Sequence, residues 1–388
     1  METTTLITLL AILLILLNFV LYPLVLIISA WLTRSKMKAQ LNLEEMPKSV
    51  SFIVVAHNAE NLIEEKINNI LTLNLHQIDY EIIVYLDGCT DKTLELINQF
   101  DSDKIILINE NQHLGKAKGL NEAANKSKNE ILVFTDMDAI LDQDAILYLL
   151  ENFKNSRCGG VCGLRTIRKN NKLQAAQSFY VKFDSYIKQL ENNSGNITSN
   201  DGKLYAIRKK LFKPIASDST DDLYNCLNIT EQRFQFIFDG RAKAYVPIPS
   251  KNTIHELSRR RRIVVRSLSG IYKKRTLLNP FEYGTFAIGL FINKVLRRTL
   301  GISMLLLLGA SFFSLPLLFY AQLLFYLGAV SYPLIFSKIG SDVFLVKFLI
   351  KVTSTSWYFC AGNYATSLAV IDFISGKRVD KWTPQKQL

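Results

Sequence analysis

The sequence is poor in the residues that build disulfide frameworks and zinc sites. Its 388 residues include five cysteines and four histidines. An odd number of cysteines without paired spacing does not form the disulfide framework of a small secreted protein. Cys158 and Cys162 could supply half of a metal site, but no second pair of cysteines or histidines accompanies them. We therefore interpret them as ordinary thiols.

Two glycine-rich motifs for nucleotides are also absent. No G-x-G-x-x-G follows the first predicted strand, and no G-x-x-x-x-G-K-[ST] occurs in the chain. The first absence excludes a dinucleotide-binding Rossmann site, and the second excludes a P-loop. A ligand that carries phosphate must be held by other groups.

Charged residues are missing from two long segments, residues 3–33 and 299–337. A helix needs about 20 apolar residues to cross a bilayer core. The first segment predicts one membrane anchor rather than a signal peptide, because its apolar part is too long and no small-residue cleavage site ends it. The second is long enough for two short spans with a break at Pro316. A last hydrophobic segment, residues 343–375, fits one span, a two-pass hairpin or an interfacial path.

The formal net charge of +12 is concentrated in one stretch. Residues 51–250 sum to −3, whereas residues 251–298 sum to +10. A protein that coats nucleic acid spreads positive charge over its folded domain, because phosphate neutralisation supplies most of its affinity. We therefore expect no nucleic-acid partner. The basic stretch predicts interfacial helices on an anionic membrane surface, where they could also cradle the diphosphate of a polyprenyl acceptor.

The positive-inside rule sets the expected orientation. Arg34, Lys36 and Lys38 follow the first span at once, which places the rest of the chain in the cytoplasm. We predict a multi-pass protein of the cell (inner or plasma) membrane. The predicted domains are an anchor and linker at 1–47, an α/β domain at 48–250, basic interfacial helices at 251–298, transmembrane segments at 299–376 and a cytoplasmic tail at 377–388.

Residues 48–135 alternate between apolar β-branched runs and helical patterns. The runs predict strands buried on both faces, at residues 50–56, 81–86, 104–108 and 130–134. The helical patterns lie between them, at residues 61–73, 92–100 and 116–127. Strict alternation predicts an α/β fold with a parallel sheet, and ligands of such sheets bind beyond the carboxyl ends of the strands.

Polar and acidic side chains follow three of these strands. Asn58 and Glu60 follow the first, Asp87 follows the second, and Asp136 and Asp138 follow the fourth. A D-x-D pair at a strand end can hold one divalent cation. Mg²⁺ and Mn²⁺ prefer oxygen ligands and commonly bridge carboxylates to substrate phosphates.

Each of these features also has a structural interpretation. The D-x-D pair could form a solvated turn. Asp87 begins a D-G-C-T-D pattern that is typical of a capped βα turn. Lys116 opens a predicted helix and can reach a phosphate, or can lie on a solvated face. Because these groups follow successive strands of one predicted sheet, we favour a ligand-binding site over the structural interpretation.

The ordered motifs resemble glycosyltransferase family 2. They are A-H-N-A-E at 56–60, D-G-C-T-D at 87–91, L-G-K-A-K-G-L-N at 114–121, T-D-M-D at 135–138 and T-D-D at 220–222. The resemblance covers about residues 50–300 and lies in order and spacing. It implies an inverting nucleotide-sugar transferase of mostly parallel, Rossmann-like GT-A fold, from the superfamily of cellulose, chitin and hyaluronan synthases.

The resemblance implies a role for each matching residue. Asp136 and Asp138 would hold Mg²⁺ or Mn²⁺ on the donor diphosphate, and Asp222 would be the general base that deprotonates the acceptor hydroxyl. The other contacts to the donor, which we expect to be a UDP-sugar, would be Ala56, Asn58, Glu60, Asp87 and Lys116. The acceptor, a glycan or lipid-linked chain, or the diphosphate would meet Asp201, Gly202, Asp221, Arg259 and Arg262.

Two motifs depart from the family pattern. The N-E pair reads Asn58-Ala59, with Glu60 one position later. The Q/R-x-x-R-W motif of processive synthases ends in Ile263 instead of tryptophan. Asp222 also has a structural alternative, because S-T-D-D is a reasonable helix start in which it would be an N-cap.

We therefore expect an enzyme that transfers a hexosyl or N-acetylhexosaminyl group at the cytoplasmic membrane face, for cell-surface polysaccharide or glycolipid synthesis. One alternative is a processive polysaccharide synthase that couples polymerisation to export. Another is a non-catalytic membrane scaffold that retains the fold, although four intact acids argue against it. A nucleotidyltransferase would leave T-D-D and the arginine run without a role.

Overall fold

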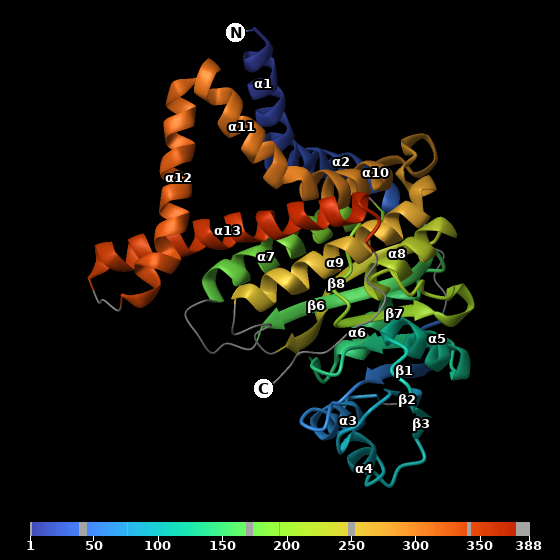
Figure 1. Cartoon of the computed structure of the whole chain (residues 1–388). Helices are drawn as coiled ribbons and strands as arrows, with labels where there is room; N and C mark the ends of the chain where they lie inside the picture. Colours follow the sequence, from blue (N-terminus) through green and yellow to red (C-terminus); the bar gives the residue numbers. More distant parts are fainter. Residues whose placement is uncertain are drawn as a thin grey trace.

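The computed structural model describes residues 2–38, 45–75, 77–167, 174–193, 195–246, 253–339 and 343–377. An α/β domain lies at one end of the molecule, and apolar helices project from the other end (Figure 1). Of the tail predicted at 377–388 only residue 377 is described, and the side chains of Arg34, Lys36 and Lys38 also lie outside the described residues.

The sheet has eight strands in the order β3-β2-β1-β4-β7-β6-β8-β5. Their bounds are β1 (Ser49–Ala56), β2 (Asp79–Asp87), β3 (Ile105–Glu110), β4 (Ile131–Thr135), β5 (Ile140–Leu141), β6 (Cys158–Ile167), β7 (Leu204–Arg208) and β8 (Gln235–Val246). The four predicted strands are confirmed as β1 to β4, and they pair in parallel. The predicted helices are confirmed in shorter form as α3 (Ile63–Leu71), α4 (Thr93–Ile97) and α5 (Lys116–Lys126).

β1 illustrates why these runs form buried strands. Val50, Phe52 and Val54 pack into the core on one face of the sheet, and Ile53 and Val55 pack into the core on the other. Successive side chains of a strand point to opposite faces, so a run that is apolar throughout needs cover on both sides. The first core is completed by α3, α4 and α6 (Ala145–Asn152), and the second by α5 and α8 (Asp221–Glu231).

The other half of the sheet was not predicted. β7 lies between β4 and β6 and is antiparallel to both, whereas β6 and β8 are parallel to each other. All five residues of β7 are buried. Its Arg208 donates hydrogen bonds to the carbonyls of Phe153 and Cys158, at 2.7 and 2.9 Å. The alternation of strand and helix patterns that predicts β1 to β4 does not extend to this run, so it was not predicted as a strand.

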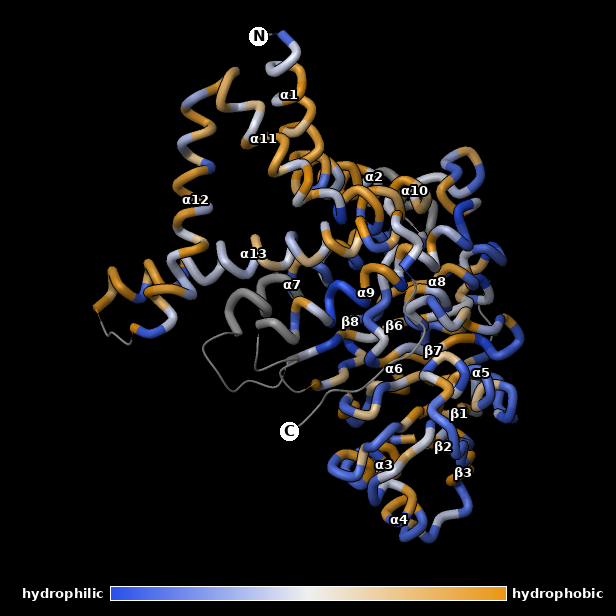
Figure 2. The backbone as a smooth tube through the Cα atoms, in the orientation of Figure 1, coloured by the Kyte–Doolittle hydropathy of each residue, from blue (hydrophilic) through white to orange (hydrophobic). Residues whose placement is uncertain are grey.

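Three helices of the described chain are long and apolar enough to cross a membrane, namely Glu2–Trp31, Pro280–Ser314 and Pro316–Lys338. The first contains α1 (Glu2–Leu16), a π-helical turn and most of α2 (Tyr22–Lys38), and the second contains α10 (Pro280–Leu290) and α11 (Leu300–Ser314). Figure 2 shows apolar residues along α1, α11 and α12 (Pro316–Leu334). The N-terminal apolar helix and the break between α11 and α12 are as predicted.

The last hydrophobic segment forms one continuous helix, α13 (Phe344–Ile374), which excludes a two-pass hairpin. It is not one of the three candidate spans and packs along α9 (Thr253–Lys273) (Figure 1). Arg261 of α9 donates to Asp372 Oδ1 at 2.7 Å, and the Arg260 guanidinium lies 4.6 Å from the centroid of the Tyr358 ring. This position fits the interfacial path.

α9 carries the arginine run, and it contacts both α8 and α13 (Figure 1). Arg259 and Arg260 pair with Glu256 of the same helix, at 3.0 and 2.8 Å. Arg266 donates to the Ser219 carbonyl at 2.7 Å. These arginines therefore bind groups of the protein, so the basic stretch is less available to a membrane surface than its summed charge suggests.

A buried carboxylate joins the N-terminal helix to the α/β domain. Glu191 of α7 (Gln174–Asn192) is 2% exposed. Its Oε1 accepts hydrogen bonds from the Tyr22 hydroxyl at 2.6 Å and from Asn293 and Thr198 at 2.7 Å, and its Oε2 accepts from the Thr198 amide at 2.8 Å. Burial raises the pKa of Glu191. The network fixes α2 against the loop that leads into β7.

Replacing Tyr22 with phenylalanine should destabilise this junction. The change removes one donor from a buried carboxyl group, which costs about 1–3 kcal/mol. We expect Tyr22→Phe to lower the Tm of the detergent-solubilised protein. Tyr186→Phe is the matched control, because that residue is 50% exposed. Equal Tm values for the two variants would contradict the network's role.

Candidate active site

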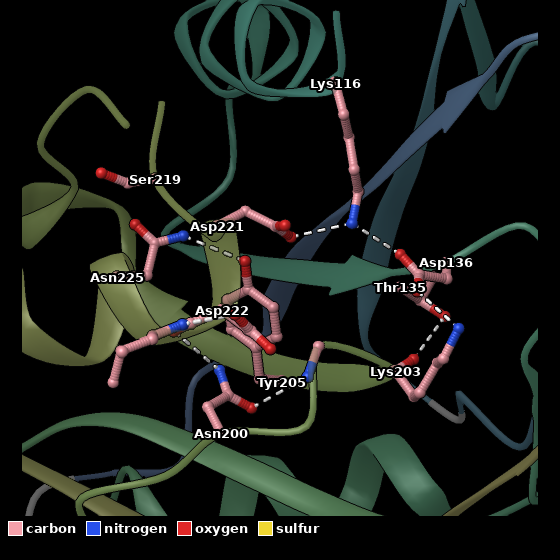
Figure 3. A network of polar contacts seen from close by, with 12 residues as sticks. Lys116, Thr135, Asp136, Asn200, Lys203, Tyr205, Ser219, Asp221, Asp222 and Asn225 are labelled. Carbon is pink, nitrogen blue, oxygen red and sulfur yellow. Dashed lines mark hydrogen bonds and ion pairs between the residues drawn. The ribbon is translucent and has the colours of Figure 1, made fainter. Parts of the chain in front are cut away.

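Lys116 joins the carboxylates of two separate motifs. Its Nζ lies 2.7 Å from Asp136 Oδ1 and 2.9 Å from Asp221 Oδ2 (Figure 3). Gly115, with φ of +96°, precedes α5 and lets Lys116 open that helix. Burial alone would lower the pKa of Lys116, but the charges of Asp136 and Asp221 raise it above its ordinary value. The structure thus brings the D-x-D and T-D-D motifs together around one charged lysine.

A second lysine, Lys203, binds the D-x-D pair. Its Nζ lies 2.7 Å from Asp136 Oδ2 and 2.8 Å from Asp138 Oδ1. Lys203 precedes β7, whose pairing with β4 sets Leu204 opposite Thr135. The Thr135 hydroxyl donates to the Lys203 carbonyl at 3.0 Å. Burial opposes ionisation of Asp136, but the two lysines outweigh it and lower the pKa of this carboxyl group.

A third lysine, Lys66, supports the loop after β4. It is fully buried, and its Nζ donates to the Thr135 hydroxyl at 2.7 Å and to the Ala139 carbonyl at 2.5 Å. Burial lowers the pKa of Lys66 to about 7, although the charges of Asp136 and Asp138 oppose this shift. These contacts fix both ends of the loop that carries the D-x-D pair.

Neither Lys66 nor Lys203 was singled out from the sequence. Lys66 shares the buried face of α3 with Ile63, Ile67 and Ile70. Its place on an apolar stripe at helical spacing was the available signal. Lys203 gave no comparable signal, because its position depends on the antiparallel pairing of β7 with β4.

The D-x-D pair has the chemistry of a divalent-cation site. Asp136 Oδ2 and Asp138 Oδ1 converge within 2.8 Å of one point, the Nζ of Lys203, and carboxylate oxygens suit Mg²⁺ and Mn²⁺. The described part of the chain contains no group of three or more His, Cys, Asp or Glu side chains that could hold a metal ion. The remaining ligands would have to come from a bound diphosphate and water.

Asp222 lies in the first turn of α8 with one carboxylate oxygen open. Its Oδ1 accepts a hydrogen bond from the Leu223 amide at 2.7 Å, and no donor in the described ranges reaches Oδ2. Thr220 is the N-cap of α8, so Asp222 does not have the capping position that was its alternative. Burial, followed by the charge of Asp221, raises the pKa of Asp222 to about 6. Such a carboxylate can accept a proton near neutral pH.

The loop before β7 approaches Asp222 closely (Figure 3). Asn200 donates to the Asp222 carbonyl at 3.3 Å. Gly202 has φ of +68°, and a Cβ there would lie 3.2 Å from Asp222 Oδ2, so a glycine allows the approach. Asp201, next to it, pairs with Lys188 of α7 at 2.8 Å. Gly202 therefore lies against the predicted base, whereas the carboxylate of Asp201 already has a cationic partner.

Asp87 holds the loop that leads into α5. It is fully buried, and its carboxylate accepts hydrogen bonds from the amides of Leu114 and Gly115 at 2.7 and 3.0 Å. Its Oδ2 also lies 3.0 Å from His113 Nδ1. Asp87 thus positions Lys116, and its contact with a nucleotide stays a prediction.

The other predicted donor residues lie at the end of β1. Ala56 is buried. Asn58 has φ of +49° and accepts a hydrogen bond from the Thr90 amide at 2.8 Å. Glu60 accepts from the Lys92 amide at 3.2 Å. The two polar side chains therefore bind the loop after β2, at the same sheet edge as Asp87.

Arg262 differs from its neighbours on α9. It is partly buried and has no hydrogen-bond or ion-pair partner in the described ranges. Burial, together with the charges of Arg266 and Arg259, lowers its pKa. Because Arg266 binds the Ser219 carbonyl, this arginine cluster lies against the segment that leads to Asp221. An anionic group bound there would balance the positive charge of this cluster.

Comparison with known proteins identifies the α/β domain. The model of glycosyl transferase family 2 matches residues 51–215, a range that ends before Asp221 and Asp222. The poly-β-1,6-N-acetyl-D-glucosamine synthase of Staphylococcus aureus (strain MSSA476) is 28% identical over 190 residues, which are 47% of this chain and 45% of the relative. That of Staphylococcus epidermidis is 25% identical over 214 residues, 52% and 50% of the two chains. The chain spans about half the length of these curated relatives.

A solved structure extends the likeness in fold. The mannosyltransferase PcManGT of Pyrobaculum calidifontis, in complex with GDP-Man and Mn²⁺, has a TM-score of 0.65 and 18% identity over 96% of this chain and 99% of that chain. At this identity the likeness concerns the fold, and it supports the predicted GT-A architecture. Residues 51–215 of the α/β domain are therefore similar to glycosyl transferase family 2, by their match to the family's model.

Proposed function

We propose that the protein is an inverting glycosyltransferase that transfers a sugar from a nucleotide-diphosphate sugar to a glycan or polyprenyl-linked acceptor. The observation that carries the proposal is Lys116, which bridges Asp136 of the D-x-D motif and Asp221 of the T-D-D motif. This bridge brings a donor motif beside Asp222, whose Oδ2 is open. The proposed product belongs to a cell-surface polysaccharide or glycolipid.

In the proposed reaction, Asp222 takes the proton of the acceptor hydroxyl. The hydroxyl oxygen forms a bond to the anomeric carbon while the bond from that carbon to the diphosphate oxygen breaks. One displacement of this kind inverts the configuration. Charge grows on the leaving diphosphate, and the ammonium groups of Lys116 and Lys203 lie at the D-x-D pair, where they can stabilise it.

Mg²⁺ or Mn²⁺ held by Asp136 and Asp138 would offset part of the same negative charge. The solved structure of similar fold is a complex with GDP-Man and Mn²⁺, which supports a nucleotide sugar and a divalent metal here. We propose a UDP-sugar with a hexosyl or N-acetylhexosaminyl group. The names of the curated relatives include N-acetyl-D-glucosamine, which supports the N-acetylhexosaminyl group.

The proposed location is the cytoplasmic face of the cell membrane. Three helices qualify as spans by length and composition, and α1, α11 and α12 project away from the sheet (Figure 1). A multi-pass anchor of this kind would keep the site near a lipid-linked acceptor. Arg262, without an acidic partner in the described ranges, is our candidate for the diphosphate of donor or acceptor.

A processive polysaccharide synthase is the second candidate. The curated relatives are named as synthases of a polymer, which favours it. Ile263 stands against it, because this residue occupies the place of the tryptophan that stacks on the acceptor sugar in the processive pattern.

The first experiment supplies membranes with a panel of radiolabelled nucleotide sugars. We expect Asp222→Asn to reduce transfer at least about 100-fold, because it removes the general base, while donor binding is retained. Asp101→Asn is the control, since this acid is exposed and lies outside the site. Full turnover by Asp222→Asn would refute the assignment of the base.

The pH profile offers an independent check. Because Asp222 must be deprotonated to act and its pKa is about 6, we expect kcat to rise with pH through about 6 and then to level off. The residual activity of Asp222→Asn should lack this rise. A wild-type rate that stays flat from about pH 5 to about pH 7 would argue against a base with this pKa.

Product length separates the two candidate functions. We expect single or few additions that depend on a lipid-linked acceptor, because Ile263 cannot stack on a sugar as an aromatic ring does. The products are to be resolved by size after incubation with one donor. Long chains formed without added acceptor would instead favour the processive synthase.

A further inference from the structure

Lys203 occupies the point at which the D-x-D oxygens converge. Its Nζ is 2.7 Å from Asp136 Oδ2 and 2.8 Å from Asp138 Oδ1. A divalent cation bound by both carboxylates would need these same two oxygens, and it would be repelled by an ammonium group at this distance. The lysine and a metal ion therefore compete for one position.

The contacts around the D-x-D pair explain this competition. The other oxygen of Asp136 binds Lys116 at 2.7 Å, so both of its oxygens already have cationic partners. The Lys203 backbone is fixed, since its carbonyl accepts from Thr135 and its neighbour Leu204 begins β7. The side chain, by contrast, is a flexible four-carbon stem with a compact charge. Rotation of this side chain alone would free Asp136 Oδ2 and Asp138 Oδ1.

We propose that Lys203 is an internal cation that keeps the D-x-D pair closed to free divalent metal until a diphosphate accepts its ammonium group. This inference rests on the proposed function, because the diphosphate is that of the nucleotide-sugar donor. The negative charge of the diphosphate gives Lys203 a new partner when the two carboxylates exchange the lysine for the metal ion. Metal and donor then bind cooperatively, and each raises the affinity for the other by the same factor. Lys203 is thus a positioning residue that couples the binding of the metal to the binding of the donor.

The test measures Mn²⁺ binding to the full chain in detergent, by the electron paramagnetic resonance signal of free Mn²⁺. Without nucleotide, we expect Lys203→Met to bind Mn²⁺ about tenfold or more tightly than the wild type, because a competing like charge has been removed. Lys118→Met is the matched control, since this lysine of α5 is half exposed and pairs with Glu122. Equal or weaker binding by Lys203→Met would overturn the proposal.

Lys203→Arg keeps the positive charge and should bind Mn²⁺ as weakly as the wild type. If it gained as much affinity as Lys203→Met, the charge would not be the cause and the proposal would fail. Each variant is accepted only when its Tm shows that it is folded. With saturating UDP or GDP, whichever binds, the difference between wild type and Lys203→Met should shrink. A difference that persists unchanged would show that the diphosphate does not take up Lys203.

Asp136→Asn combined with Asp138→Asn separates this inference from the proposed function. We expect the double variant to lose Mn²⁺ binding. If it binds Mn²⁺ like the wild type, the metal role of the D-x-D pair is wrong and the proposed function fails in that part. If it loses Mn²⁺ while Lys203→Met behaves as the wild type, only the role of Lys203 is wrong.

Discussion

The charge balance between two lysines and three aspartates is the interaction on which the site depends. Asp136, Asp138 and Asp221 gather at one sheet edge, where their mutual repulsion and partial burial would be costly without cations. Lys116 and Lys203 each bridge two of them. Because these residues come from the loop after β4, the start of α5, the approach to β7 and the start of α8, the bridges also fix four parts of the chain relative to one another.

The sequence predicts well what local pattern determines. Strands β1 to β4 are apolar at nearly every position, and their helices alternate with them, so the parallel half of the sheet follows from periodicity. The second half depends on pairings between distant segments. β7 becomes a strand because β4 and β6 lie on either side of it, and the position of Lys203 follows from that register. No local signal reports such contacts.

The candidate site also divides into features that local sequence predicts and features that depend on contacts between distant segments. The D-x-D pair was found from its place after a buried strand, and the T-D-D motif through the resemblance. Lys116 was predicted at a helix start, and the structure shows that it joins the two motifs. For Asp87, Asn58 and Glu60 the motifs gave the correct sheet edge, but not the hydrogen bonds that tie these side chains to neighbouring loops. Summed charge likewise could not show that most arginines of α9 have partners within the fold, because a sum does not record which groups the arginines contact, such as Asp372 for Arg261 and the Ser219 carbonyl for Arg266.

The Glu191 junction gives the N-terminal helix a structural role in the α/β domain. Tyr22 and Leu26 of α2 lie in one apolar cluster with Ile187, Leu190 and Ile292, around the carboxylate that also holds the loop before β7. A soluble fragment that begins at β1 would therefore expose the apolar residues of this cluster and leave the Glu191 carboxylate without the Tyr22 hydroxyl. Both changes would lie on the side of the domain where the loop before β7 approaches Asp222. The N-terminal helix is therefore part of the packing around the α/β domain as well as a candidate membrane span.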